Sequence, residues 1–245
     1  MRIMVFGTGG VAGFFGAQLA RAGEDVIFIA RGEHLRAIRA DGLRVETPGG
    51  EIVISPAQAT DDPAEAAGVE AVLVGVKAWQ VGEAARTMRP AIGPETFVVP
   101  LQNGVDAASE LAAVLGSDHV LAGLCGTFSW VTAPGRIRSV GVANFIKFAE
   151  LDNRPSDRTA RLRGAFRRAG VAVKVPPDVH KALWEKFLTV TAVGGVGAVT
   201  RAAIGVTRAM PETRGLLERW ARLHAIRTVL SLAATVLYLA LALER

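Results

Sequence analysis

The chain has little cysteine and little lysine, and each shortage has a consequence. Cys125 is the only cysteine among 245 residues, so the chain can form no internal disulfide. Only five lysines accompany 23 arginines, so arginine is the ordinary surface cation of this chain. A lysine can release its proton more easily than an arginine can, so each lysine position is examined for a functional role. No signal-peptide pattern precedes the first strand-like run, which together with the single cysteine predicts a cytoplasmic protein.

The chain also lacks a long run of one charge. Its net charge of +5 comes from basic residues that are spread along the sequence with acidic residues between most of them, which argues against a nucleic-acid partner. The one basic cluster, "RTARLRGAFRR" (158–168), has helical spacing and is interpreted as a solvated helix face. Half of the residues are hydrophobic, so the chain can bury a substantial core.

The order of apolar runs in the first hundred residues predicts a parallel sheet. "RIMVF" (2–6), a glycine turn with a helical pattern, and "DVIFIA" (25–30) form a β–α–β unit. Two further strand-like runs, at 70–77 and 96–104, each lead into another helical pattern. Strands that alternate with helices in this way predict a mainly parallel sheet covered on both faces.

The second half of the chain has a different texture. Short strand-like runs within 120–151 are expected to extend the sheet in antiparallel fashion. Two prolines at 176–177 then precede a long helical stretch. The prediction is therefore an α/β fold, in which a Rossmann-like dinucleotide-binding domain over 1–175 is followed by a smaller all-helical domain over 176–245, for substrate binding or dimerisation.

The glycine turn after the first strand carries the pattern G-x-G-x-x-A on Gly7, Gly9 and Ala12. Gly7 permits the tight turn, Gly9 lets the backbone approach a pyrophosphate, and the small Ala12 lets helix and strand pack closely. The helix N-terminus adds free N–H groups and a positive dipole end for the phosphates. The turn is thus predicted to bind a dinucleotide.

Arg31 follows the second strand of this unit, where NAD-binding proteins normally place an acidic residue for the ribose 2′-hydroxyl. An arginine at this place suits the 2′-phosphate of NADP. Glu33 lies two residues further on and leaves NAD open. The predicted cofactor is NADP(H).

These motifs resemble the ketopantoate reductase (2-dehydropantoate 2-reductase) family, NADPH-dependent enzymes of pantothenate biosynthesis with a Rossmann domain followed by a helical domain. The matching segments occur in the family's order and cover the chain from residue 1 to roughly 215. They are "GTGGVAGFFG", "ARGEHLRAIRADGL", "VKAWQV", "LQNGV" and "LWEKF".

The resemblance implies roles for particular positions. Lys77 is placed near the cofactor, Asn103 contacts the nicotinamide ribose and the substrate, and Lys186 is the catalytic acid. The chemistry supports the last role, because hydride delivered to a ketone carbon leaves an alkoxide that a nearby ammonium can protonate. The expected catalytic residues are Lys186 and Asn103; the expected cofactor-binding residues are Gly7, Gly9, Gly10, Ala12, Gly13, Arg31, Lys77 and Asn103; no metal is expected.

Two departures from the family's pattern concern the substrate. Ketopantoate reductases typically carry asparagines four and eight residues after this lysine, and here these positions are Val190 and Gly194. Each loss leaves a polar group of a hydroxylated substrate unpaired, at a cost of ~1–3 kcal/mol. Thr189 is the nearest hydroxyl on the lysine's face of the helix. Family members also supply a serine and a glutamate from later helices, and neither can be located in this chain.

The C-terminal stretch "TVLSLAATVLYLALAL" (228–243) has sixteen residues without a charge. A helix of that length spans about 24 Å, which is shorter than the roughly 30 Å hydrocarbon core of a bilayer. A mildly polar stripe favours packing against protein over a membrane segment. We expect self-association through this helix, because so large an apolar patch is unusual on a monomer.

The leading hypothesis is an NADPH-dependent reductase of a small 2-oxo acid, which by family is 2-dehydropantoate. The alternatives are a reductase of a different 2-oxo acid, a non-catalytic NADP-binding remnant, and a membrane-tethered protein.

Overall fold

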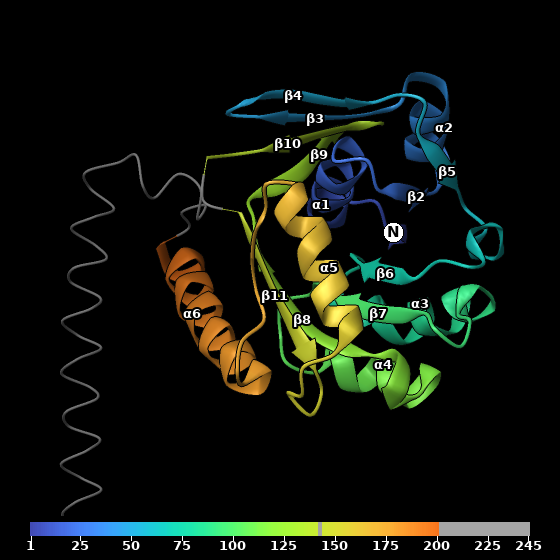
Figure 1. Cartoon of the computed structure of the whole chain (residues 1–245). Coiled ribbons are helices and arrows are strands. Elements are labelled where there is room, and N and C mark those ends of the chain that lie inside the picture. The colour runs from blue at the N-terminus through green and yellow to red at the C-terminus, as the bar shows by residue number, and fades with distance from the viewer. Residues whose placement is uncertain (142–143, 201–245) are drawn as a thin grey trace, which may run out of the picture. The chain divides into compact units, whose positions relative to one another are not determined.

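The computed structural model describes residues 1–141 and 144–200. The chain divides into two compact units, Met1–Phe187 and Leu188–Arg245, and each is considered by itself. The first unit contains every strand of the described residues (Figure 1). Of the second unit, the described residues are the later turns of helix α6 (Val179–Thr200).

A five-stranded parallel sheet forms the centre of the first unit, as predicted. Its strand order is β5-β2-β1-β6-β7, so the chain reverses direction across the sheet between β1 and β6. The strands are β1 (Arg2–Phe6), β2 (Asp25–Ile29), β5 (Gln58–Thr60), β6 (Ala71–Val74) and β7 (Phe97–Pro100). In sheets of this kind ligands bind outside the carboxyl ends of the strands at such a switch point.

Helices cover both faces of this sheet. Alternate residues of β1 enter different cores: Ile3 and Val5 pack with α1 and α5, whereas Met4 and Phe6 pack with α3 and α4. Burial on both faces explains why the strands read as continuous apolar runs. The helices are α1 (Gly10–Arg21), α2 (Gly32–Asp41), α3 (Val81–Met88), α4 (Ala107–Leu115) and α5 (Asp157–Arg168), with short 3-10 helices η1 (Pro63–Ala66), η2 (Ala78–Gln80), η3 (Arg89–Ala91) and η4 (Ser117–His119).

The later strands exist as predicted, but the expected antiparallel extension of the central sheet is wrong. They join two other sheets, of order β4-β3-β10-β9 and β12-β11-β8. An isolated parallel bridge from Val98 to Val120 links β7 to the start of β8. The strands are β3 (Leu43–Thr47), β4 (Gly50–Ile54), β8 (Leu121–Gly126), β9 (Ser129–Ala133), β10 (Arg136–Ser139), β11 (Phe145–Glu150) and β12 (Ala172–Lys174).

The physical reason for this difference is the free edge of strand β3, which the sequence pattern does not reveal. The β3–β4 hairpin leaves one side of β3 open, and β10 pairs with it in parallel, Ile137 opposite Val45. Unpaired backbone groups at an edge favour this addition. The strands β9 and β10 are thereby drawn away from β8 and across α1.

Helix α6 begins at Val179, two residues after the second proline of the pair at 176–177, as the sequence predicts. It opens the helical part of the α/β fold. The proposed boundary between domains 1–175 and 176–245 stays a prediction. The apolar C-terminal stretch (228–243), through which we expect self-association, lies outside the described residues. In the ranges 1–141 and 144–200, no helix has the length and apolar character to span a membrane.

Candidate functional site

The glycine turn joins β1 to α1 at the carboxyl edge of the sheet. Gly7 has a φ of +86°, and a Cβ there would lie 2.8 Å from Val76 Cγ1, so only glycine fits. A Cβ added at Gly9 would meet nothing closer than the Gly7 carbonyl oxygen at 4.0 Å, which leaves open space beside the turn. Gly75 faces Ala12 so closely that no side chain could be added there. The turn therefore combines tight packing behind with free space in front.

Gly10 and Gly13 have a different environment from Gly9. A Cβ on Gly10 would lie 2.5 Å from the Trp130 Cα, and one on Gly13 would collide with the Ile137 side chain. The N–H of Gly13 already donates to the Gly9 carbonyl at 2.9 Å. The missing side chains of Gly10 and Gly13 thus make room for β9 and β10, and only the backbone of Gly10 can serve a cofactor.

An open cavity of about 360 Å³ lies in front of this turn. Its lining brings together Gly7, Gly9, Arg31 and Lys77, four of the predicted cofactor residues. Arg31 directly precedes α2 and is exposed, and no ion pair within the described ranges involves its guanidinium. The first turn of α1 contains no acidic residue. This end of the cavity is therefore suited to a phosphate.

His34 lines the same cavity and was not singled out by the sequence. Its Nδ1 accepts a hydrogen bond of 3.0 Å from the Gly135 N–H, which ties α2 to the β9–β10 turn. Burial lowers the pKa of His34, against a smaller opposing effect of the Thr8 backbone. The ring is therefore neutral near pH 7, and the positive charge at this end of the cavity comes from Arg31. In the sequence, the spacing of three residues between Arg31 and His34 at the start of a helix could have indicated that both side chains lie at the same site.

A second cavity of about 310 Å³ adjoins the first and shares Gly75, Val76 and Lys77 with it. It lies beyond the ends of β6 and β7, and Asn103 lines it. The two cavities form one groove, which we call the dinucleotide groove. It brings the glycine turn, Arg31, Lys77 and Asn103 together at the switch point of the sheet.

Gln102 is a second residue that sequence reasoning left without a role. It is buried, and its amide Nε2 donates to the carbonyl oxygens of Val74 and Val76, each at 3.0 Å. These two bonds fix the orientation of the amide, because a flipped group would set oxygen against oxygen. Gln102 thus braces the end of β7 against the end of β6 and positions the neighbouring Asn103.

Lys186 lies on α6, half-buried, beside Cys125. Burial lowers the pKa of Lys186, while Cys125 acts in the opposite direction. Burial also raises the pKa of the Cys125 thiol to about 11, and that thiol donates to the Leu101 carbonyl at 3.5 Å. Cys125 lines the Asn103 end of the groove, and Lys186 is close enough to Cys125 for their charges to interact, although Lys186 is not among the described residues that line either cavity. A lysine whose pKa is lowered in this way can exchange a proton more readily than an exposed one.

Val190 and Gly194 follow Lys186 on α6 at spacings of four and eight residues. A Cβ added to Gly194 would meet no atom of the described residues within 4 Å. The described residues therefore do not obstruct a larger side chain at Gly194. Among the described residues, no three His, Cys, Asp or Glu side chains gather as a metal site would require.

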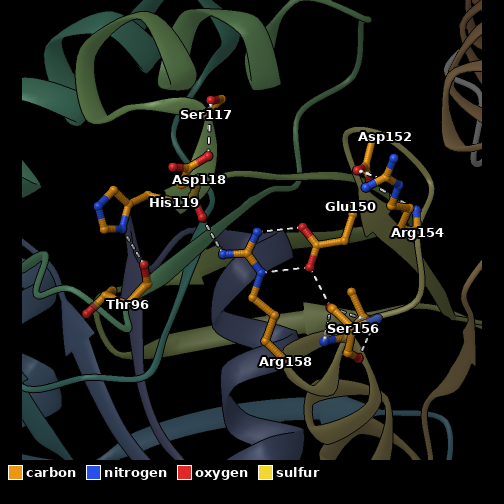
Figure 2. A network of polar contacts seen from close by, with 10 residues as sticks. Thr96, Ser117, Asp118, His119, Glu150, Asp152, Arg154, Ser156 and Arg158 are labelled. Carbon is orange, nitrogen blue, oxygen red and sulfur yellow. Dashed lines mark hydrogen bonds and ion pairs between the residues drawn. The ribbon is translucent and has the colours of Figure 1, made fainter.

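A different arrangement of charges occurs where β11 meets α5 (Figure 2). Buried Glu150 accepts hydrogen bonds from Arg158 Nε at 2.7 Å and Nη2 at 2.5 Å, and from the Ser156 hydroxyl at 2.5 Å. Arg158 also donates to the Asp118 carbonyl and lies 5.9 Å from the Phe97 ring centroid. We call these residues the Glu150 network; it ties the three-stranded sheet to the central one.

Comparison with known proteins agrees with this geometry. A family model described as "Ketopantoate reductase PanE/ApbA" matches residues 3–153, more than half of the chain. A 2-dehydropantoate 2-reductase of Halobacterium salinarum is 30% identical over 222 residues, which cover 89% of this chain and 72% of that protein. The "Uncharacterized oxidoreductase YkpB" of Bacillus subtilis is 25% identical, covering 97% of this chain and 75% of that protein. The crystal structure of 2-dehydropantoate 2-reductase from Porphyromonas gingivalis W83 superimposes with a TM-score of 0.77 at 33% identity, covering 91% and 81%.

Proposed function

The chain belongs to the ketopantoate reductase family, and we propose that it reduces a 2-oxo acid with Lys186 as the general acid. By the family's default the reaction converts 2-dehydropantoate to pantoate. The protein is an oxidoreductase with NADP(H) as its cofactor. The family role also implies a place in pantothenate biosynthesis. The expected location is the cytoplasm, which cell fractionation would test.

The residues of the dinucleotide groove fit this cofactor. Gly9 leaves space for a pyrophosphate, the first turn of α1 carries no acidic residue, and the Arg31 guanidinium has no carboxylate partner in the described ranges. When bound, NADPH supplies the hydride. Lys77 and Asn103 line the part of the groove beyond the glycine turn, where they can orient the nicotinamide half and the substrate.

The proton step rests on one observation, the half-buried Lys186 whose pKa is lowered by burial and which interacts with Cys125, a residue that lines the groove. Its ammonium polarises the keto oxygen and donates a proton from Nζ to that oxygen as the hydride reaches the carbon. The ketone becomes a hydroxyl, and the neutral amine regains its proton from solvent. Burial favours this transfer, because it weakens the hold of the lysine on its proton.

A reductase of a different 2-oxo acid is the second candidate, and Val190 and Gly194 favour it. Neither residue can pair with a polar group of ketopantoate. The discriminating experiment follows NADPH absorbance with purified full-length protein, comparing ketopantoate with 2-oxo acids that lack its 4-hydroxyl. Turnover with ketopantoate at low KM would support the family default; better turnover of the others would support the second candidate. Binding of NADPH without oxidation by any of them would identify a non-catalytic remnant.

A further inference from the structure

A cavity of about 520 Å³ outside the dinucleotide groove has a strongly basic lining. Four cations face it: Lys147 from β11, Arg163 and Arg167 from α5, and Lys174 from β12. The rest of its lining is apolar, from Val173 and the 175–177 segment, and none of the described residues that line it carries a carboxylate. It shares no lining residue with the groove. We call it the basic cavity.

The two lysines of the basic cavity lie directly opposite each other. Lys147 pairs with Lys174 in the parallel register of β11 and β12. Neighbouring strands are roughly 4.8 Å apart, and side chains opposite each other in the register project from the same face. Like charges in such a pair destabilise the sheet. Two of the chain's five lysines therefore lie opposite each other at this cavity, where Lys147 also lies 5.6 Å from the Phe145 ring centroid.

The two arginines repeat this pattern on the helix. Arg163 and Arg167 are four residues apart on α5, so their guanidiniums lie on one face and repel each other. Other arginines of α5 have carboxylate partners: Arg158 pairs with Glu150 at 2.5 Å, and Arg168 with Glu24 at 2.6 Å. Arg158 and Arg168, which do not line the cavity, are thus bound to carboxylates. Arg163 and Arg167, which line it, have no ion pair within the described ranges.

We propose that the basic cavity binds a small molecule that carries two or more phosphate groups. A polyanion would sit between the two like-charged pairs and convert both repulsions into attraction. The arginine forks match phosphate oxygens in a bidentate manner, and the lysines add compact point charges. Two like-charged pairs that violate local rules at one place are typical of a ligand site. This site is separate from the catalytic groove, and its test requires no enzymatic activity.

The test uses the full chain at low salt with saturating NADP⁺, so that the dinucleotide groove is occupied. Inorganic tripolyphosphate is titrated by calorimetry, and binding at one site is expected. The variants R163Q/R167Q and K147Q/K174Q should each weaken binding roughly tenfold or more, because each removes two charged phosphate contacts.

The control R21Q/R136Q loses two exposed arginines outside the cavity and should change the affinity less than about twofold. Without tripolyphosphate, K147Q/K174Q should melt no lower than the unmodified chain, since a repulsive pair is gone.

Other outcomes would overturn the proposal. Equal weakening by the cavity variants and the control would mean general attraction to a basic protein. If R163Q/R167Q and K147Q/K174Q both bind tripolyphosphate as tightly as the unmodified chain, the anion binds outside the basic cavity. Short duplex DNA that binds more tightly than tripolyphosphate, with the same dependence on these four residues, would identify a nucleic-acid surface instead.

Discussion

The dinucleotide groove and the Glu150 network both contain charged side chains, but they differ in whether these charges have partners within the chain. In the network, Glu150 accepts three hydrogen bonds from its own chain. In the groove, Arg31 and Lys77 have no ion pair within residues 1–141 and 144–200. A partly buried charge needs a partner within the fold, whereas exposed charges such as Arg31 and Lys77 are solvated and remain available to a ligand. Their place in the groove, together with the absence of an ion pair within the described ranges, therefore suits them to bind an anion.

The largest effect that this comparison predicts is on catalysis. Lys186→Ala should lower kcat by ~10²–10⁴-fold and leave NADPH affinity nearly unchanged, because the ammonium acts on the substrate oxygen. Lys186→Arg should not restore the rate, since arginine holds its proton too tightly. Lys181→Ala, which removes an exposed lysine from the same helix, is the matched control and should keep full activity. Steady-state kinetics and cofactor fluorescence provide both measurements.

The pH profile sharpens the same prediction. A general acid must be protonated, so kcat should fall as the pH rises through the pKa of Lys186. Because burial lowers that pKa, the fall should occur below the usual lysine value of 10.5. Full activity in Lys186→Ala, or a flat profile up to that value, would contradict the proposed mechanism.

The next effect concerns the paired region and is on stability. Glu150→Gln should lower the free energy of unfolding by roughly 3 kcal/mol, because it leaves the partly buried Arg158 guanidinium without its counter-charge. Glu46→Gln is the control, since the exposed pair of Glu46 with Arg138 contributes at most ~1 kcal/mol. Urea unfolding of both variants at neutral pH gives the comparison; equal losses would mean that burial does not distinguish the two pairs.

Acid sharpens the test of Glu150. Burial raises the pKa of Glu150, but the hydrogen bonds from Arg158 and Ser156 outweigh it and hold the pKa below the usual 4.5. Since the folded pKa is the lower one, the stabilisation is present above the unfolded pKa and is lost as the pH falls through the folded value. The unmodified chain should therefore lose more stability than Glu150→Gln between neutral pH and that range.

The sequence predicts most of the central fold, because its signals are local. The glycine turn, the β1–α1–β2 unit and the proline pair before α6 each follow from residues that are close together in the chain. Strand pairing is not local in this way: β10 finds its partner β3 about ninety residues earlier, Ile137 opposite Val45. Apolar patterns show that a strand exists and do not show which edge it joins.

The same limit applies to the site. Arg31, Lys77 and Asn103 belong to short motifs, and the structure brings them into one groove. Gln102 and His34 act through backbone groups of distant residues, so their spacing carries no pattern. Contacts with the main chain can be made by many side-chain types, and only the folded structure reveals them.

A smaller effect is expected on cofactor choice. NADPH should raise the melting temperature more than NADH does, because Arg31 can pair with the additional phosphate. Arg31→Ala should weaken NADPH binding by roughly tenfold and leave NADH binding nearly unchanged. Arg21→Ala, which removes an exposed arginine of α1 that is not among the described lining residues of the groove, should preserve the preference. The same preference for NADPH after Arg31→Ala would refute this role.

The smallest effect is a gain of function on α6. Val190→Asn and Gly194→Asn restore the asparagines that ketopantoate reductases typically carry at these positions, and each should lower the KM for ketopantoate severalfold, since one hydrogen bond contributes ~1 kcal/mol. An added Cβ at Gly194 has no atom of the described residues within 4 Å, so none of these residues obstructs the new side chain.

Gly194→Ala controls for the higher helix propensity of any residue that replaces glycine and should stabilise the fold without changing KM. A 2-oxo acid without the 4-hydroxyl should gain less than ketopantoate from the two substitutions, because it has one polar group fewer for the asparagines to contact. If neither substitution lowers the KM for ketopantoate, then Val190 and Gly194 do not determine substrate choice, and the preference must be set by residues nearer to Asn103.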